Sequence, residues 1–200
     1  QTLILTPSSR DSKSRNGLSN PQQPSARCSR YVDYGIRLTI QANKAYLAQR
    51  GGVKIVDVSN PASCPQIGSI DLPGRATAID VVDNRAYVGQ SWIPNGFHIF
   101  DITNPQQPQA MGFLATPNTP YAIDALPNRV YAATDELLDI DAHDPTNPTV
   151  QDQMPLPGWP QKIVTVGHSI YIAASYGGMI VVRDGPLATR QLLPLVLHRR

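Results

Sequence analysis

Charged residues are scarce in this sequence, and long apolar runs are lacking. Charged residues make up 16% of the 200 residues, and the formal net charge is only +2. Electrostatic binding of nucleic acid needs a clustered basic surface, and Lys and Arg are scattered outside the first 34 residues. No apolar run approaches the roughly 20 residues that a membrane-spanning helix needs. We therefore expect no nucleic-acid partner and no transmembrane segment.

The motifs of common enzymes are also missing. None of the four His residues stands in an HExxH pattern or in another paired metal-ligand spacing. The sequence has no Gly-rich phosphate loop and no nucleophile elbow. These absences predict that the protein is not an enzyme, with no catalytic residue and no cofactor.

Cysteine is rare, with only Cys28 and Cys64. A disulfide needs Cβ atoms within about 3.5–4.5 Å of each other, whereas packed sheets lie about 10 Å apart. Regular packing of repeated sheets would therefore keep the two thiols apart unless the N-terminal residues fold back. A disulfide would suit a secreted protein, and the sequence alone leaves the pairing open.

Short strands at a regular spacing are what the sequence does contain. Tyr46, Tyr87, Tyr131 and Tyr171 follow one another at spacings of 41, 44 and 40 residues. A period of about 40–45 residues with several short strands is typical of β-propeller blades. Asn-Pro turns and Gly pairs bound the strands, and no stretch shows helical periodicity. The sequence therefore predicts an all-β propeller.

Four blades are predicted, near residues 35–72, 76–115, 121–154 and 161–197, in a repeat domain covering 35–200. Residues 1–34 form a polar arm that also holds a partial blade, because NPQQP occurs both at 20–24 and at 104–108. Residues 25–31 are then expected to be the outer strand of that partial blade. The prediction is a four- to five-bladed ring or an incomplete arc.

The repeats resemble the LVIVD-repeat family of β-propellers. The resemblance lies in GVKIVDVSNP at 52–61, FHIFDITNP at 97–105 and IDVVDNRAYV at 79–88, and it extends over about 35–184. It implies a bacterial or archaeal protein that is secreted or on the cell surface, without a common catalytic site. Family members usually close larger rings than four blades.

Acidic residues recur at one position and break the pattern at another. Asp57, Asp101 and Asp141 precede the turns that follow each third strand, where a carboxylate can accept turn N–H bonds. Asp139, by contrast, stands where Ile55 and other repeats have an aliphatic residue, and burying it unpaired would cost several kcal/mol. The neighbouring carboxylates make a candidate metal cluster: Asp135, Glu136, Asp139, Asp141 and Asp144. The alternative is that this blade opens to solvent or faces a partner.

One face of the predicted propeller gathers aromatic and guanidinium side chains. The loops after the second and fourth strands of each blade open on that face, where we expect Arg50, Arg75, Trp92, Tyr121, Trp159 and Tyr176. Such side chains are enriched at protein interfaces, so these six are the candidate partner-binding residues. The alternative is that each Trp covers its own blade as a lid.

Ring closure is the last question that the sequence raises. Either the N-terminal arm folds in as a reduced fifth blade, with residues 3–5 as a further strand, or the arc stays open against a partner. An open arc would expose Ile36, Leu38 and Ile40 at one end and Ile163 and Val181 at the other.

The leading hypothesis for function is a non-enzymatic interaction or scaffold subunit of a larger assembly. We expect it to be extracytoplasmic, whether secreted, periplasmic or on the cell surface, with a protein partner. The alternative is a metal-binding protein or an enzyme that uses the acidic cluster around Asp139.

Overall fold

The computed structural model describes residues 35, 37–60, 62–92, 94–183 and 193–194, and its regular elements are all β-strands. The first six are β1 (Arg37–Gln41), β2 (Lys44–Asp57), β3 (Gln66–Val82), β4 (Arg85–Ser91), β5 (Gly96–Asp101) and β6 (Gln109–Ala115). The next four are β7 (Ala122–Leu126), β8 (Arg129–Ala133), β9 (Glu136–Asp141) and β10 (Thr149–Pro155). The last four are β11 (Trp159–Val166), β12 (Ser169–Ser175), β13 (Gly178–Arg183) and β14 (Leu193–Pro194). In this described part, no helix is long and apolar enough to cross a membrane.

The strands pair antiparallel into units of four. Unit 1 holds β1, the two halves of β2 and the start of β3, while unit 2 holds the rest of β3 with β4, β5 and β6. Unit 3 is β7–β10, and unit 4 is β11–β14. Within β2 the chain turns at Gly51 and Gly52, which both have positive φ, a conformation that glycine adopts without strain. After β2 the chain lies beside the turn that precedes this strand, where Val58 N donates a hydrogen bond to Asn43 O (2.8 Å).

The repeat tyrosines occupy the same register position in every unit. Each pairs with a residue of the inner strand: Tyr46 with Thr39, Tyr87 with Asp80, Tyr131 with Asp124 and Tyr171 with Val164. The period of the sequence is therefore the period of the structure, with one tyrosine at this register position in each unit.

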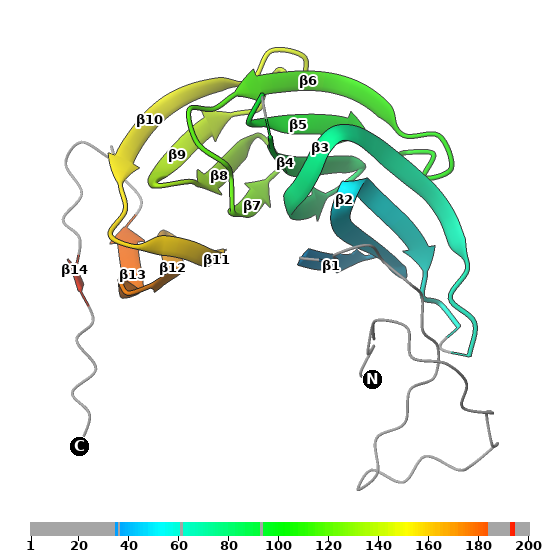
Figure 1. Cartoon of the computed structure of the whole chain (residues 1–200), viewed down its shortest axis with the longest axis horizontal. Coiled ribbons are helices and arrows are strands. Elements are labelled where there is room, and N and C mark those ends of the chain that lie inside the picture. The colour runs from blue at the N-terminus through cyan, green and yellow to red at the C-terminus, as the bar shows by residue number, and fades with distance from the viewer. Residues whose placement is uncertain (1–34, 36, 61, 93, 184–192, 195–200) are drawn as a thin grey trace, which may run out of the picture.

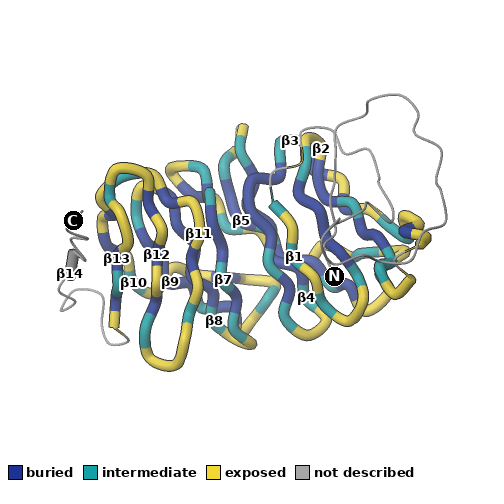
Figure 2. Tube along the Cα trace, turned by 90° about the horizontal axis from the view of Figure 1, so that it is seen from below, coloured by how far each residue is buried: buried dark blue, intermediate teal, exposed yellow. Residues whose placement is uncertain are grey.

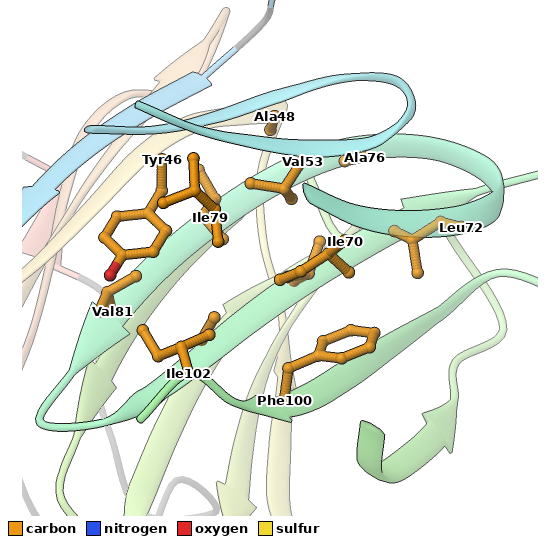
Figure 3. Packing of buried hydrophobic residues seen from close by; sticks show 13 residues of the cluster. Tyr46, Ala48, Val53, Ile70, Leu72, Ala76, Ile79, Val81, Phe100 and Ile102 are labelled. Atoms are coloured by element: carbon orange, nitrogen blue, oxygen red, sulfur yellow. The ribbon is translucent and has the colours of Figure 1, made fainter. Parts of the chain in front are cut away.

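The core lies between the units, because the two faces of each sheet are both apolar. One cluster fills the space between units 1 and 2, including Tyr46, Ile70, Ile79 and Phe100 (Figure 3). Separate clusters fill the spaces between units 2 and 3 and between units 3 and 4. Figure 2 shows the buried residues along the strands and the exposed residues at the turns on both ends. Burial thus joins each unit to its neighbours rather than closing it on itself.

Two inner-strand carboxylates tie neighbouring units together. Asp80 Oδ2 accepts a hydrogen bond from Ala125 N of unit 3 (2.9 Å), and its Oδ1 accepts from Val81 N. Asp124 Oδ2 accepts from Thr165 N of unit 4 (2.5 Å). Burial raises the pKa of Asp124, and the bond to Thr165 opposes that rise. These bonds fix the offset between successive inner strands.

The recurrent turn carboxylates have the structural role that the sequence predicts. Asp57, Asp101 and Asp141 each accept a bond from the backbone N–H two residues later, at 2.8 Å in every case. Hydrogen bonds from the side chain and then the backbone of Ser59 lower the pKa of Asp57, and those from the side chain and backbone of Thr103 lower the pKa of Asp101. Each carboxylate therefore stabilises the turn after its third strand.

The units fan out as an arc around a central axis, with β1, β7 and β11 near the centre (Figure 1). The first and last units meet through Arg37, whose Nη2 donates to Gln161 O (3.1 Å). Leu38 and Ile40 are exposed at one end of the arc, as predicted. Ile163 was expected to be exposed at the other end, but this prediction is wrong. It is buried against unit 3 because its side chain lies on the opposite face of β11 from Val164, which is exposed.

The all-β, propeller-like architecture is confirmed, whereas the number of blades in a complete ring stays a prediction. The expected arm and partial blade at 1–34 lie outside the described residues. Of the outer strand expected at 191–197, the structure describes β14, which pairs with Ile180 and Val181. Cys64 is disulfide-bonded, and the other cysteine of the sequence, Cys28, lies outside the described residues.

We expect Asp80→Ala to lower the free energy of unfolding by about 2–3 kcal/mol, because it leaves the Ala125 N–H without its charged acceptor. Urea denaturation measures this loss. Asp71→Ala is the control, since Asp71 is an exposed carboxylate of the same strand, and it should change stability by less than about 0.5 kcal/mol. Equal losses in the two variants would contradict a role in joining the units.

Candidate partner-binding rim

The six candidate residues lie at one end of the units, where the inner strands begin and the second strands end. We call this surface the rim. It divides into two groups by contact. Arg50, Arg75 and Trp92 come from units 1 and 2, and Tyr121, Trp159 and Tyr176 come from units 3 and 4.

The first group brings two arginines together beside an indole. Arg50 pairs in register with Arg75 across β2 and β3, and its Cζ lies 5.6 Å from the centroid of the Trp92 ring. Arg75 Nε is buried without a hydrogen-bond partner. Among the described residues the ion pair found is elsewhere, between Arg129 and Asp139. Within the described residues no carboxylate forms an ion pair with either guanidinium group, so two like charges face each other at the rim.

The second group is a stacked aromatic pair with a third ring nearby. The rings of Tyr121 and Trp159 lie 6.0 Å apart between centroids, at an interplanar angle of 17°. Trp159 pairs in register with Ser175, the residue before Tyr176. Trp92 and Trp159 are exposed by 55% and 67%, and Tyr176 is fully exposed. The alternative in which each Trp covers its own unit as a lid does not match this exposure.

Two of these aromatic residues have a strained backbone. Trp92 and Tyr176 each follow the serine that ends a second strand, and their φ angles are 75° and 63°. A left-handed conformation costs a residue with a side chain roughly 1–2 kcal/mol. Such strain persists only where the surroundings impose it, and it gathers at functional sites. The rim thus holds two exposed aromatic rings at equivalent positions of units 2 and 4.

A buried polar chain holds the Trp92 loop in place. Gln90 is buried, its Nε2 donates to Pro94 O (2.8 Å), and its Oε1 lies 3.2 Å from His98 Nε2. The His98 ring also packs on Phe113 at 4.5 Å between centroids. Burial lowers the pKa of His98 to about 4, so the ring is neutral at pH 7. Nothing in the sequence singled out Gln90 or His98, since their partner Pro94 belongs to an insertion that the other repeats lack.

The acidic cluster around Asp139 is broken up by bonds within the chain. Asp139 is 3% exposed and is held by Arg129, whose Nε donates to Oδ1 (2.6 Å) and whose Nη2 donates to Oδ2. The expectation that this unit opens to solvent or faces a partner at Asp139 is therefore wrong. Arg129 was not among the residues that the sequence singled out. Its guanidinium group binds both oxygens of Asp139 and so takes the place of an external cation.

Three of the other carboxylates of the cluster accept hydrogen bonds within the chain. Asp135 accepts from Asn118 Nδ2 (2.8 Å), Asp141 from His143 N and Asp144 from Thr146 N. Glu136 N bonds to Thr134 Oγ1, which places its backbone in the turn. Within the described ranges no group of three or more His, Cys, Asp or Glu residues could hold a metal ion.

The sequence and the fold were compared with known proteins. The LVIVD repeat family matches residues 37–71 and 73–116. No curated protein matches the sequence at a significant level.

Solved structures similar to the chain include a protein from Lactobacillus plantarum, with a TM-score of 0.66, 12% identity, and 80% of this chain and 55% of that chain covered. The computationally designed Ika4 protein has a TM-score of 0.62, 14% identity, and coverage of 78% and 94%. BamB from Moraxella catarrhalis has a TM-score of 0.56, 13% identity, and coverage of 74% and 44%. The chain thus spans about half the length of the first and third of these proteins, and identities this low show the fold alone.

We expect Arg129→Met to lower the free energy of unfolding by about 2–3 kcal/mol, because it leaves the buried Asp139 carboxylate unpaired. The double variant Arg129→Met with Asp139→Val should recover most of this loss, since Val181 fills the same register position in unit 4. Chemical denaturation measures both variants. A double variant as unstable as the single one would refute the pairing as the cause.

We expect stability to fall as the pH drops from 7 to 5, with His98 as one cause. The unfolded histidine takes up a proton near pH 6.5, whereas the folded one does so only near 4, so acid favours the unfolded chain in this window. Allowing for solvent screening, the contribution at pH 5 is about 1 kcal/mol. His98→Phe should flatten the dependence by that amount in thermal or urea unfolding. An unchanged slope would show that His98 does not cause it.

Proposed function

We propose that this chain, an LVIVD-repeat protein with a propeller-like fold, is a non-enzymatic interaction or scaffold subunit that binds a protein partner through its rim. The partner meets the arginine pair of units 1 and 2 and the aromatic group of units 3 and 4 together. The repeats hold both groups on one surface, and the function is to present that surface within a larger assembly.

The observation that carries this proposal is the pair of strained, exposed aromatic residues. Trp92 and Tyr176 adopt left-handed φ angles and are largely or fully exposed. Burial of the two rings within the chain therefore does not offset the backbone strain. Aromatic side chains and Arg supply most hot spots of protein interfaces. Burial of both rings against a partner would contribute favourable free energy that offsets the backbone strain.

The acidity of the partner follows from the charge of the first group. Arg50 and Arg75 face each other without a described carboxylate, and Arg75 Nε lacks a bond. A carboxylate of the partner would neutralise both guanidinium groups and satisfy this buried donor. We therefore infer a partner with an acidic side chain set among apolar ones.

An extracytoplasmic location is supported by the state of Cys64, which is disulfide-bonded. Disulfides persist in oxidising compartments and are rare in the cytosol. The chain would accordingly act as a secreted, periplasmic or cell-surface subunit. The acidic cluster supports no second function, because Arg129 occupies both oxygens of Asp139.

Substitution by glycine separates the role of the rim from folding. We expect Trp92→Gly and Tyr176→Gly to leave stability unchanged or to raise it by up to about 1 kcal/mol, because glycine adopts positive φ freely. The double variant should nonetheless weaken binding about thirtyfold, the loss of roughly 2 kcal/mol expected of hot spots. The measurement is affinity capture from the native source, followed by titration of the captured partner.

Gln106→Ala with Gln107→Ala is the matched control, since both side chains are exposed in the turn at the other end of unit 2. This control should capture the partner as the wild type does. Equal capture by the glycine variant would refute the rim as the binding surface.

A further inference from the structure

One segment of the chain joins the two groups of the rim. Residues 116–120 lead from β6, the outer strand of unit 2, to β7, the inner strand of unit 3 (Figure 1). We call them the connecting segment. It lies tightly against β4, because a Cβ at Gly89 would stand only 2.9 Å from Pro120 O and 3.1 Å from Pro120 Cβ. Glycine at position 89 thus lets the connecting segment cross unit 2 in close contact.

At its start the connecting segment holds the residues that follow Trp92. Thr116 N donates to Asn95 O (3.2 Å), and Thr119 Oγ1 donates to Asn95 Oδ1 (3.1 Å). Asn95 Nδ2 also lies 3.5 Å from Pro117 O, a distance at which a hydrogen bond is weak. The hydroxyl of Thr119 therefore supplies the short side-chain bond between the Trp92 loop and the connecting segment.

At its end the connecting segment holds Tyr121 of the aromatic group. Thr77 is buried, and its Oγ1 donates to Pro120 O (2.6 Å). Tyr121 N then donates to Ala133 O (2.9 Å), which brings this residue into the sheet of unit 3. The Tyr121 ring, which stacks with Trp159 of unit 4, therefore starts from a backbone that is fixed to both units 2 and 3.

The middle of the connecting segment is tied to the neighbouring turn of unit 3. Asn118 Nδ2 donates to both carboxylate oxygens of Asp135 at 2.8 Å, and Thr116 Oγ1 donates to Asn118 O (2.8 Å). Asp135 O in turn accepts from Leu156 N (2.9 Å), between β10 and β11. Hydrogen bonds thus hold the connecting segment at its start, its middle and its end.

These bonds complete one continuous path of contacts across the rim. Arg50 lies against Trp92, and the residues after Trp92 are bonded to the connecting segment. That segment leads directly into Tyr121, which stacks with Trp159. A site whose parts move independently loses more conformational entropy on binding than a site whose parts are already fixed. The path therefore favours the binding of one partner by both groups at once.

We infer that Thr119 is a positioning residue of the rim. Its hydroxyl holds Asn95, and thereby Trp92, at a fixed place relative to Tyr121, so that the arginine pair and the aromatic group act on the partner as a single rigid site. This inference rests on the proposed function, because it states how the rim binds rather than whether it binds. Thr119 is half-buried, and its role requires no contact with the partner.

Thr119→Val tests the bond, because valine keeps the shape of threonine and removes the hydroxyl donor. The chain has two tryptophans, so Trp159→Phe leaves Trp92 as the only one. In that background Thr119→Val should lower the fluorescence anisotropy of Trp92 and raise its quenching by acrylamide, by at most about twofold because the residue is already 55% exposed. Thr119→Ser, which restores the hydroxyl, should behave like the wild type. Asn95→Ala, which removes the acceptor of the same bond, should give the same change as Thr119→Val.

Two controls separate the loss of this bond from a general loosening of the rim. In the opposite background, Trp92→Phe, the signal of Trp159 should not change with Thr119→Val, because Tyr121 keeps its own backbone bond. Thr103→Val, in the turn at the other end of unit 2, removes a hydroxyl that bonds within its own turn, and it should leave Trp92 unchanged. An equal change at both tryptophans would overturn the inference.

The same variants with both tryptophans in place are then titrated with the protein that the wild type captures and the double variant of Trp92→Gly and Tyr176→Gly does not. Thr119→Val should weaken this binding about fivefold, the cost of ordering one side chain on association, whereas Thr119→Ser and Thr103→Val should bind as the wild type does. Unchanged Trp92 fluorescence or unchanged affinity in Thr119→Val overturns the inference, even where the rim binds its partner. If the wild type captures no partner through the rim, the proposed function fails instead, and the fluorescence still decides whether Thr119 positions Trp92.

Discussion

A four-stranded unit of this chain has two apolar faces, and neither can be buried within the unit. Every other feature of the fold depends on this constraint. Stacking unit on unit buries both faces in turn, which is why the core consists of separate clusters between sheets. The carboxylates of Asp80 and Asp124 then set the offset between neighbours. At the two ends of the row the faces are covered unequally: Leu38, Ile40, Val166 and Tyr171 are exposed, whereas Ala45, Leu47 and Val56 of unit 1 are buried in a separate cluster.

The rim lies outside the buried faces of the units, so its residues can differ from one repeat to the next. The strands beneath it repeat the same register in each unit, whereas the loops above carry different residues, among them Arg50, Trp92, Asp135 and Tyr176. The scaffold tolerates left-handed residues there because strand pairing on both sides fixes the loop ends. Stability resides in the repeats, and specificity is left to a few side chains that the repeats do not determine.

The sequence predicted what repeats and missed what does not. Tyrosine spacing and Asn-Pro turns fixed the strands because each recurs in register, and the turn role of Asp57 and Asp101 followed from recurrence as well. Arg129 was missed because its partner Asp139 is a single exception to the pattern. Its place ten residues before Asp139 becomes meaningful only once β8 and β9 are seen to pair.

The sequence also failed to predict which face of a strand a single side chain lies on. Ile163 and Val164 are adjacent and both aliphatic, so nothing in their residue types indicates which one faces unit 3. A register bulge between Pro160 and Lys162 shifts the alternation of β11 by one residue, and such a shift exchanges the two faces of a strand. The rim residues could be predicted as a group because the order of the strands determines at which end of a unit each loop lies. Strand order does not determine which face of a strand a side chain lies on.

The length of β3 has a consequence for how the protein opens. This single strand pairs with β2 in its first part and with β4 in its second, so units 1 and 2 share one sheet, whereas units 3 and 4 have sheets of their own. Local unfolding proceeds in cooperative blocks that follow shared hydrogen-bond ladders. We therefore expect units 1 and 2 to open as one block and units 3 and 4 as smaller ones, with amide exchange in unit 1 coupled to that in unit 2.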